Sequence, residues 1–184
     1  MRYDEYKISR NLAWEILLQE RITKLPISVS GICKNMGIKI RYYIPKDDNS
    51  GMSMILDGVP VILVSQNEST ERQRFTAAHE LGHILLGHIG KYQLVNREPS
   101  GSDNPIERAA NIFASRLLAP ACVLWGCGVK NADDIATLCR ISKQSAEYRM
   151  ERMKILYERN LFLTSVLERK VYQNFKPYIN SNGL

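Results

Sequence analysis

Two histidines and a glutamate stand within five positions of one another: His79, Glu80 and His83, in the pattern His-Glu-x-x-His. On a helix this spacing puts both imidazoles on one face, about 6 Å apart along the axis, where they can bind one zinc ion. Glu80 can reach a water at the metal without being a ligand, and can accept its proton. The pattern predicts a metal-dependent hydrolytic site. The alternative interpretation is two surface histidines and a helix-stabilising glutamate.

A catalytic zinc needs a third protein ligand and an open position. The metzincin pattern would place glycine at position 86 and histidine or aspartate at position 89, where this chain has Leu86 and Ile89. The better candidate is Glu107, which would complete a His₂Glu site, although alone it would be read as a first-turn acid favoured by the helix dipole. Asn111, one turn further on the same face, could accept a hydrogen bond from a zinc-bound histidine.

Two helices must position these residues. The first is expected to begin with a capping box of Thr70 and Gln73 and to run to about residue 86, where Gly87 can end it. One of its faces is apolar and suited to burial in a core, with Ala77, Ala78, Leu81, Ile84 and Leu85. The second helix is predicted over 105–118, with proline in its first turn. The polar stretch between them, 91–105, is expected to be a loop.

A hairpin is predicted before the first of these helices. Two apolar runs, 52–56 and 59–64, flank Asp57-Gly58, a pair typical of a tight hairpin turn. Pro60 in the second run indicates that this strand has a free edge or a bulge. Before the hairpin we expect three further elements: a helix over 9–24, a short helix capped by Ser28 or Ser30 and ending at Met36, and a strand over 38–44.

The C-terminal part is predicted to be helical and basic. Residues 132–159 have helix-turn-helix proportions with the turn at residues 140–142, and another helix is expected over 164–175. Residues 140–184 hold nine Lys or Arg against four Asp or Glu, and so carry nearly all of the net charge of +6. A basic patch can attract nucleic acid or an acidic protein surface. The alternative is a solvated helix face.

Length, hydropathy and cysteine content limit the classes to which the protein can belong. With 184 residues the chain is one domain, or one domain with a small appendage. No apolar run approaches the roughly eighteen residues of a membrane span, and the N-terminus has no apolar signal segment. The cysteines form no CxxC pair and are expected to be free thiols in a reducing cytoplasm: Cys33, Cys122, Cys127 and Cys139.

Two stretches resemble the ImmA/IrrE-type metallopeptidases of bacteria and their mobile elements. The first is RQRFTAAHELGHILL over 72–86, and the second is ERAANIFA over 107–114, followed by LLAP over 117–120. The resemblance covers about residues 25–160, including the hairpin turn and the C-terminal helix pair. The two stretches together are much more specific than His-Glu-x-x-His alone.

This resemblance implies an α+β fold with a thermolysin-like minimal zincin core: a small antiparallel or mixed sheet, an active-site helix and a Glu-bearing helix. Residues 1–125 would form the metallopeptidase core with its N-terminal helices. Residues 126–184 would form a helix-turn-helix-like helical extension. Larger family members carry a C-terminal sensor domain, and we expect none here.

The resemblance also implies a role for each residue of the pattern. His79, His83 and Glu107 would bind one Zn²⁺ per chain, and Glu80 would be the base. Family members cleave, or otherwise inactivate, a helix-turn-helix repressor, which relieves repression of a mobile element or a stress response. We therefore expect a cytoplasmic zinc endopeptidase with a protein substrate and no membrane partner.

Residues around the predicted metal site suggest where a peptide substrate would bind and what would stabilise the oxyanion. A peptide could add as a strand to the free edge of the hairpin, across the metal. His88 is a candidate for stabilising the oxyanion, with Tyr92 behind it, and the alternative for both is a structural or surface role.

Two other functions remain open at this point. One is DNA binding through the C-terminal helix pair, which is basic but interleaved with Glu147 and Glu151, and these acids weaken the attraction for phosphate. Its basic residues are Lys143, Arg149, Arg152 and Lys154. The other is non-proteolytic sequestration of a repressor, with zinc as an element of the fold.

Overall fold

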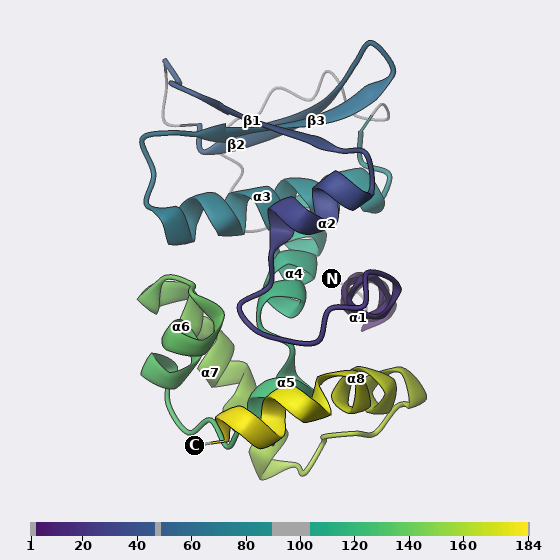
Figure 1. The fold of residues 1–184 in the computed structure, drawn as a ribbon, viewed down its shortest axis with the longest axis vertical. Helices are drawn as coiled ribbons and strands as arrows, with labels where there is room; N and C mark the ends of the chain where they lie inside the picture. The colour runs from purple at the N-terminus through teal and green to yellow at the C-terminus, as the bar shows by residue number, and fades with distance from the viewer. Residues whose placement is uncertain (1–2, 47–48, 90–103, 184) are drawn as a thin grey trace. The chain divides into compact units, whose positions relative to one another are not determined.

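The computed structural model describes residues 3–46, 49–89 and 104–183 (Figure 1). The fold is mixed α+β, as predicted, with a small three-stranded sheet and many helices. Its elements are α1 (Tyr3–Gln19), α2 (Val29–Asn35), β1 (Lys39–Tyr43), β2 (Gly51–Leu56), β3 (Val59–Ser65), α3 (Thr70–Leu85), α4 (Pro105–Leu118), α5 (Ala121–Gly126), α6 (Ala132–Cys139), α7 (Lys143–Glu158) and α8 (Val166–Asn182).

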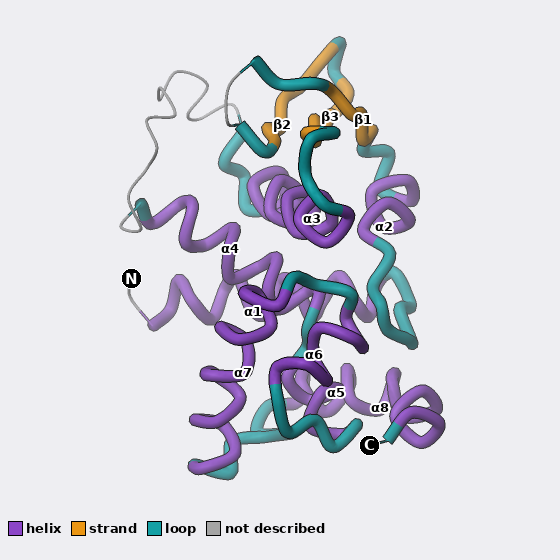
Figure 2. The backbone as a smooth tube through the Cα atoms, turned by 90° about the vertical axis from the view of Figure 1, so that its left-hand side faces the viewer, coloured by secondary structure: helices purple, strands orange, loops and turns teal. Residues whose placement is uncertain are grey.

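The chain divides into two compact units. The first comprises Met1–Ser9 and Ser28–Ala114, and the second comprises Arg10–Ile27 and Ser115–Leu184. The sheet, α2, α3 and the start of α4 belong to the first unit, in which the sheet lies over α3 (Figure 1). The described secondary-structure elements of the second unit are helices joined by turns, and the described strands belong to the first unit (Figure 2). The division predicted at residue 125 stays a prediction.

The sheet has the strand order β1-β3-β2, with β3 parallel to β1 and antiparallel to β2. The predicted hairpin is present. Its turn residues Asp57 and Gly58 both have positive φ, 50° and 75°, as a tight two-residue turn requires.

The prediction of a free edge at Pro60 is wrong, because β3 is the central strand and β2 lies at the edge. Pro60 stands opposite Ile55, one residue before Val61, where the parallel pairing with β1 begins. A proline is tolerated there because the strand is not yet paired on both sides.

Helix α3 begins and ends close to its predicted bounds, but its cap differs. The N-cap is Ser69, whose Oγ accepts a hydrogen bond from the backbone N–H of Arg72. Gln73 donates instead to the carbonyls of Ser65 and Glu68, so the predicted box with Thr70 does not form. The helix ends where predicted, with Gly87 in a left-handed conformation directly after the cap.

The second unit confirms the predicted helix pair and adds a helix that the sequence did not predict. Helices α6 and α7 flank a short turn in which Arg140 has a φ of 49° and Ser142 caps α7. The additional helix, α5, follows Pro120 and has buried residues at Ala121–Leu124, so it shows no alternation of apolar and polar positions. Helix α8 runs beyond its predicted end and includes Pro177.

Burial accounts for two features of composition. All four cysteines are free and buried, as predicted. By length and composition, the stretch Pro105–Gly126 could cross a membrane, which the sequence analysis did not anticipate, but 67% of its most apolar window is buried inside the fold. That burial is typical of a core helix.

Candidate metal centre

Three side chains from α3 and α4 converge on one point. His79 Nε2 lies 3.1 Å from Glu107 Oε2, His83 Nε2 lies 3.4 Å from Glu107 Oε1, and the two Nε2 atoms are 2.9 Å apart. Among the described residues these three form a group that could hold a metal ion. The structure therefore brings together the three residues for which the sequence predicted a shared role.

The spacing of the three donor groups fits zinc. Ligand atoms about 2.0–2.1 Å from a tetrahedral zinc ion lie about 3.3–3.4 Å from one another. The two Nε2 atoms are 2.9 Å apart and lie 3.1 and 3.4 Å from the two different carboxylate oxygens of Glu107, which is close to this value. Two imidazole nitrogens and one carboxylate are also a donor set that catalytic zinc sites use. The residues present therefore fit the ion that the sequence predicted.

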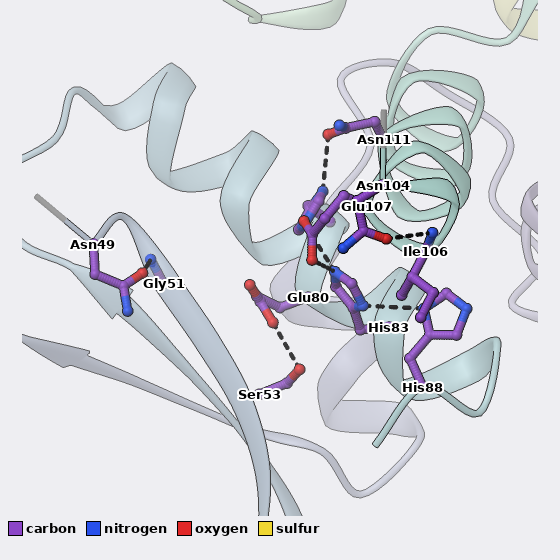
Figure 3. A network of polar contacts seen from close by, with 11 residues as sticks. Asn49, Gly51, Ser53, Glu80, His83, His88, Asn104, Ile106, Glu107 and Asn111 are labelled. Atoms are coloured by element: carbon purple, nitrogen blue, oxygen red, sulfur yellow. Dashed lines mark hydrogen bonds and ion pairs between the residues drawn. The ribbon is translucent and has the colours of Figure 1, made fainter. Parts of the chain in front are cut away.

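The outer contact of His79 supports a cation at this point. Its Nδ1 lies 2.9 Å from Asn111 Oδ1, which can only accept a hydrogen bond, so Nδ1 must carry the proton (Figure 3 shows the labelled Asn111 on its helix). When the ring is neutral, Nε2 then carries no proton and can bind a metal ion. Asn111 lies beside His79, as the sequence predicted, and its role in orienting a metal-binding histidine stays a prediction.

The position of Glu107 follows from how α4 begins and how closely α4 packs on α3. Asn104 caps the helix, because its Oδ1 accepts from the N–H of Ile106. Gly82, between the two histidines, permits the close approach: a Cβ there would lie 2.9 Å from Cδ1 of Phe113. A larger residue at position 82 would press on the side chain of Phe113 and disturb the packing of α4 on α3.

The two histidines beside Glu107 hold it in its charged form. The contacts from His79 and His83 lower the pKa of its carboxyl far below the ordinary range and outweigh its partial burial, which acts in the opposite direction. The group is thus a carboxylate at neutral pH, which is the form that binds a metal.

Glu80 lies on the other side of the histidines, facing the sheet. It is buried, and its Oε2 accepts a 2.7 Å hydrogen bond from Ser53 Oγ on the edge strand β2. Figure 3 shows Glu80 between this strand and the side chains of His83 and Glu107. The strand can approach α3 because a Cβ on Gly51 would clash with Thr76. The carboxylate is therefore held beside His83 and Glu107 by a residue outside the motif.

Ser53 is a site residue that the sequence analysis missed. It lies 27 residues before Glu80, in a strand whose edge position the sequence did not predict. The available signal was the alternation of β2: Gly51, Ser53 and Ile55 share one face, and only the first two are small.

His88 does not lie with the three converging donors. Its Nδ1 lies 3.0 Å from Nδ1 of His83, the ring nitrogen that Glu107 does not contact. Burial, followed by the neighbouring His83, lowers the pKa of His88 to about 4. Its proposed contact with an oxyanion stays a prediction, and Tyr92 lies outside the described residues.

A comparison with known protein families finds a match to the segment that contains this site. Residues 33–151 match the Peptidase_M78 family model, described as the IrrE N-terminal-like domain. This match covers more than half of the chain and contains β1–β3, α3 and α4, with every residue of the converging group. No curated protein matches the chain.

Proposed function

The chain belongs to the IrrE N-terminal-like peptidase family, the ImmA/IrrE family that its motifs resemble, and from this premise we propose that it is a zinc-dependent endopeptidase. The observation that carries this proposal is the convergence of His79, His83 and Glu107 on one point. A peptidase of this kind acts on a protein substrate.

Each residue of the site has a defined task in this proposal. His79 and His83 hold zinc through Nε2, and Glu107 holds it through its carboxylate. When bound, zinc supplies a Lewis acid that polarises the scissile carbonyl and acidifies water. Glu80 takes the proton from the attacking water and passes it to the nitrogen of the leaving peptide. Ser53 keeps the Glu80 carboxylate in place by donating to Oε2.

The edge strand β2 offers a place for the substrate. Its outer side is not paired with another strand of the described sheet, and Ser53 within it contacts the proposed base. An extended peptide that added to this edge through main-chain hydrogen bonds would lie beside Glu80. This arrangement favours cleavage of an extended or locally unfolded segment.

We propose a helix-turn-helix repressor as the substrate, so that cleavage relieves repression of a mobile element or a stress response. The support for this step is the family resemblance. We place the activity in the cytoplasm, because a reducing compartment keeps the four buried thiols free.

DNA binding through α7 is less well supported than this proposal. Arg149 is buried and its Nε donates to the carbonyl of Ala119, so it is not available to a phosphate. Lys143 and Lys154 are exposed, but the exposed Glu147 and Glu151 lie between them. A gel shift at low salt tests the alternative, since binding that weakens steeply with salt would favour it.

Cleavage of a helix-turn-helix repressor, one encoded beside this gene where the genome has one, is the direct test of the proposal. The unaltered protein should cut it in the presence of zinc, and Glu80→Gln should slow cleavage about 10²–10⁴-fold while keeping the metal. Glu71→Gln, a partly exposed acid in the first turn of the same helix, is the matched control. Undiminished cleavage by Glu80→Gln would reject the mechanism. A stable complex without products would favour sequestration.

A further inference from the structure

The two proposed zinc-binding histidines each have an outer partner, and the two partners differ. His79 contacts Asn111 through Nδ1, and His83 contacts His88 through Nδ1. We propose that His88 is a positioning residue: its Nδ1 accepts the proton of His83 Nδ1–H and so holds His83 ready to bind zinc through Nε2. This inference rests on the proposed metal site and extends it to a residue outside the motif.

The end of α3 brings His88 back onto His83. Gly87 adopts a left-handed conformation with φ of 71°, which reverses the chain after the helix. The backbone N–H of His88 then donates to the carbonyl of His83 at 2.9 Å, and that of Leu86 donates to the carbonyl of Gly82. This closure is the usual way in which a glycine ends a helix. It fixes the backbone of His88 relative to the ligand that its ring contacts.

The two rings meet edge to face. Their centroids are 5.1 Å apart with an interplanar angle of 66°, and the two Nδ1 atoms are 3.0 Å apart. Figure 3 shows His88 on the side of His83 that faces away from Glu80. His88 is therefore poorly placed to contact the reacting peptide and well placed to orient a metal ligand.

The direction of the hydrogen bond follows from the opposite nitrogen of His83. Nε2 lies 2.9 Å from His79 Nε2 and 3.4 Å from Glu107, so it must present a lone pair if the three groups share one ion. A neutral imidazole carries its proton on the other nitrogen, which makes Nδ1 of His83 the donor and Nδ1 of His88 the acceptor. A partner of this kind fixes both the proton position and the ring orientation of a metal ligand.

Zinc affinity, measured by competition with a fluorescent chelator at constant pH, tests this role without a peptide substrate. His88→Phe keeps an aromatic ring and removes the acceptor, and we expect it to weaken zinc binding about 10- to 100-fold. His88→Asn places an amide oxygen near the position of Nδ1 and should stay within a few-fold of the unaltered protein. Ile89→Ala, the next residue along, controls for disturbance of the segment.

Nitrogen-15 NMR of the imidazole rings supplies a second readout. In the zinc-loaded protein, His83 should carry its proton on Nδ1, and His88→Phe should make that proton exchange faster with solvent. The unfolding temperature of the zinc-free protein should be the same for His88→Phe and His88→Asn, which separates positioning from packing.

The outcomes distinguish this inference from the proposed function. If His88→Phe binds zinc as tightly as the unaltered protein, or if His88→Asn is as weak as His88→Phe, the role of His88 is rejected and the metal site stands. An equal loss in Ile89→Ala would also reject it. If the unaltered protein binds no zinc, the proposed function and this inference fall together.

Discussion

Both units of the molecule bury charged or titratable side chains, and they use them differently. In the first unit Glu80 and His83 are 3% and 6% exposed, and in the second Arg149 and Glu168 are 2% and 4% exposed. Burial alone therefore does not distinguish a functional group from a structural one. Each group buried without a partner would cost several kcal/mol, so the partners are informative.

The buried charges of the second unit contact the main chain at the ends of helices. Arg149 Nε donates to the carbonyl of Ala119 at 2.7 Å. Glu168 accepts from the backbone N–H of Thr164 at 3.0 Å and, at 3.5 Å, from the hydroxyl of the same residue, while Ser165 caps the same helix. Such bonds satisfy polar groups that a helix end leaves free. Their task is to join helices and to begin them.

The groups of the first unit contact other side chains. The ring nitrogens of His79 and His83 and the carboxylate of Glu107 converge on one point, and Glu80 contacts Ser53. Two imidazole nitrogens and a carboxylate that meet in this way can bind one metal ion between them. The difference teaches that the nature of the partner, rather than the depth of burial, marks the functional site.

The largest effect that follows from this contrast is stabilisation by zinc. At a free zinc concentration of about 1,000 times Kd, the folded protein should gain about 4 kcal/mol in free energy of unfolding. The double variant His79→Ala/His83→Ala should gain none. Chemical denaturation with and without zinc measures both. Equal stabilisation of the double variant would place the metal elsewhere.

Removing a buried charge from the second unit should reduce stability and leave metal binding intact. Arg149→Ala leaves the carbonyl of Ala119 without its donor and opens a cavity, and we expect a loss of about 3 kcal/mol. Lys154→Ala, on the exposed face of the same helix, should change stability by less than about 0.5 kcal/mol. The amount of zinc bound per folded chain should be unchanged. A loss of zinc in Arg149→Ala would contradict the structural role assigned to this residue.

The outer partner of His79 should affect zinc and not the fold. Asn111→Leu removes the acceptor of His79 Nδ1–H and should weaken zinc binding about 10- to 100-fold, by the chelator assay. Asn111→Asp retains an acceptor and should preserve the affinity. If the leucine variant instead lowers the unfolding temperature of the zinc-free protein and leaves affinity unchanged, Asn111 belongs with the structural groups.

Ser53 should influence the rate of peptide cleavage and not the binding of zinc. Ser53→Ala removes the hydroxyl that holds Glu80, and we expect kcat for repressor cleavage to fall about 10-fold, equivalent to about 1.4 kcal/mol. Ser53→Thr keeps the hydroxyl and should recover most of the rate. Zinc content should be the same in all three proteins. A rise in KM with constant kcat would indicate that Ser53 binds the substrate instead.

The smallest predicted effect is the loss of stability at high pH that buried thiols cause. It should be similar in the two units. Burial raises the pKa of Cys33 in the first unit and of Cys122 in the second to about 12. Above about pH 9 the unfolded chain loses these protons and the folded chain keeps them, so stability falls as pH rises. At pH 9.5 each buried thiol should lower the free energy of unfolding by about 1 kcal/mol or slightly less. Cys33→Ala and Cys122→Ala should each flatten the pH dependence between pH 8 and 9.5.

The chemistry of the site could be predicted from the sequence because it depends on local spacing. His79, Glu80 and His83 share one helix, and a helix fixes their relation whatever surrounds it. Glu107 was predicted from its place at the start of the next helix and from the family resemblance. The bounds of α4 were predicted because Pro105 and Pro120 flank an apolar stretch.

The rest depends on how distant segments pack. The strand order could not be predicted, because Pro60 is compatible both with an edge strand and with the start of a central one. Ser53 was missed for the same reason, since its contact with Glu80 requires β2 at the edge beside α3. Arg149 was listed among the basic residues of the predicted helix pair, and only the packing of α7 shows that it is buried. His88 was predicted beside the site, but its contact with His83 depends on the chain reversal at Gly87.

Zinc content of the purified protein tests the central claim most directly. Elemental analysis by mass spectrometry should find one zinc per chain in the unaltered protein and in Glu80→Gln, where all three proposed ligands remain. It should find none in the triple variant His79→Ala/His83→Ala/Glu107→Ala, provided that the variant is folded by circular dichroism. One zinc per chain in that folded triple variant would contradict the account.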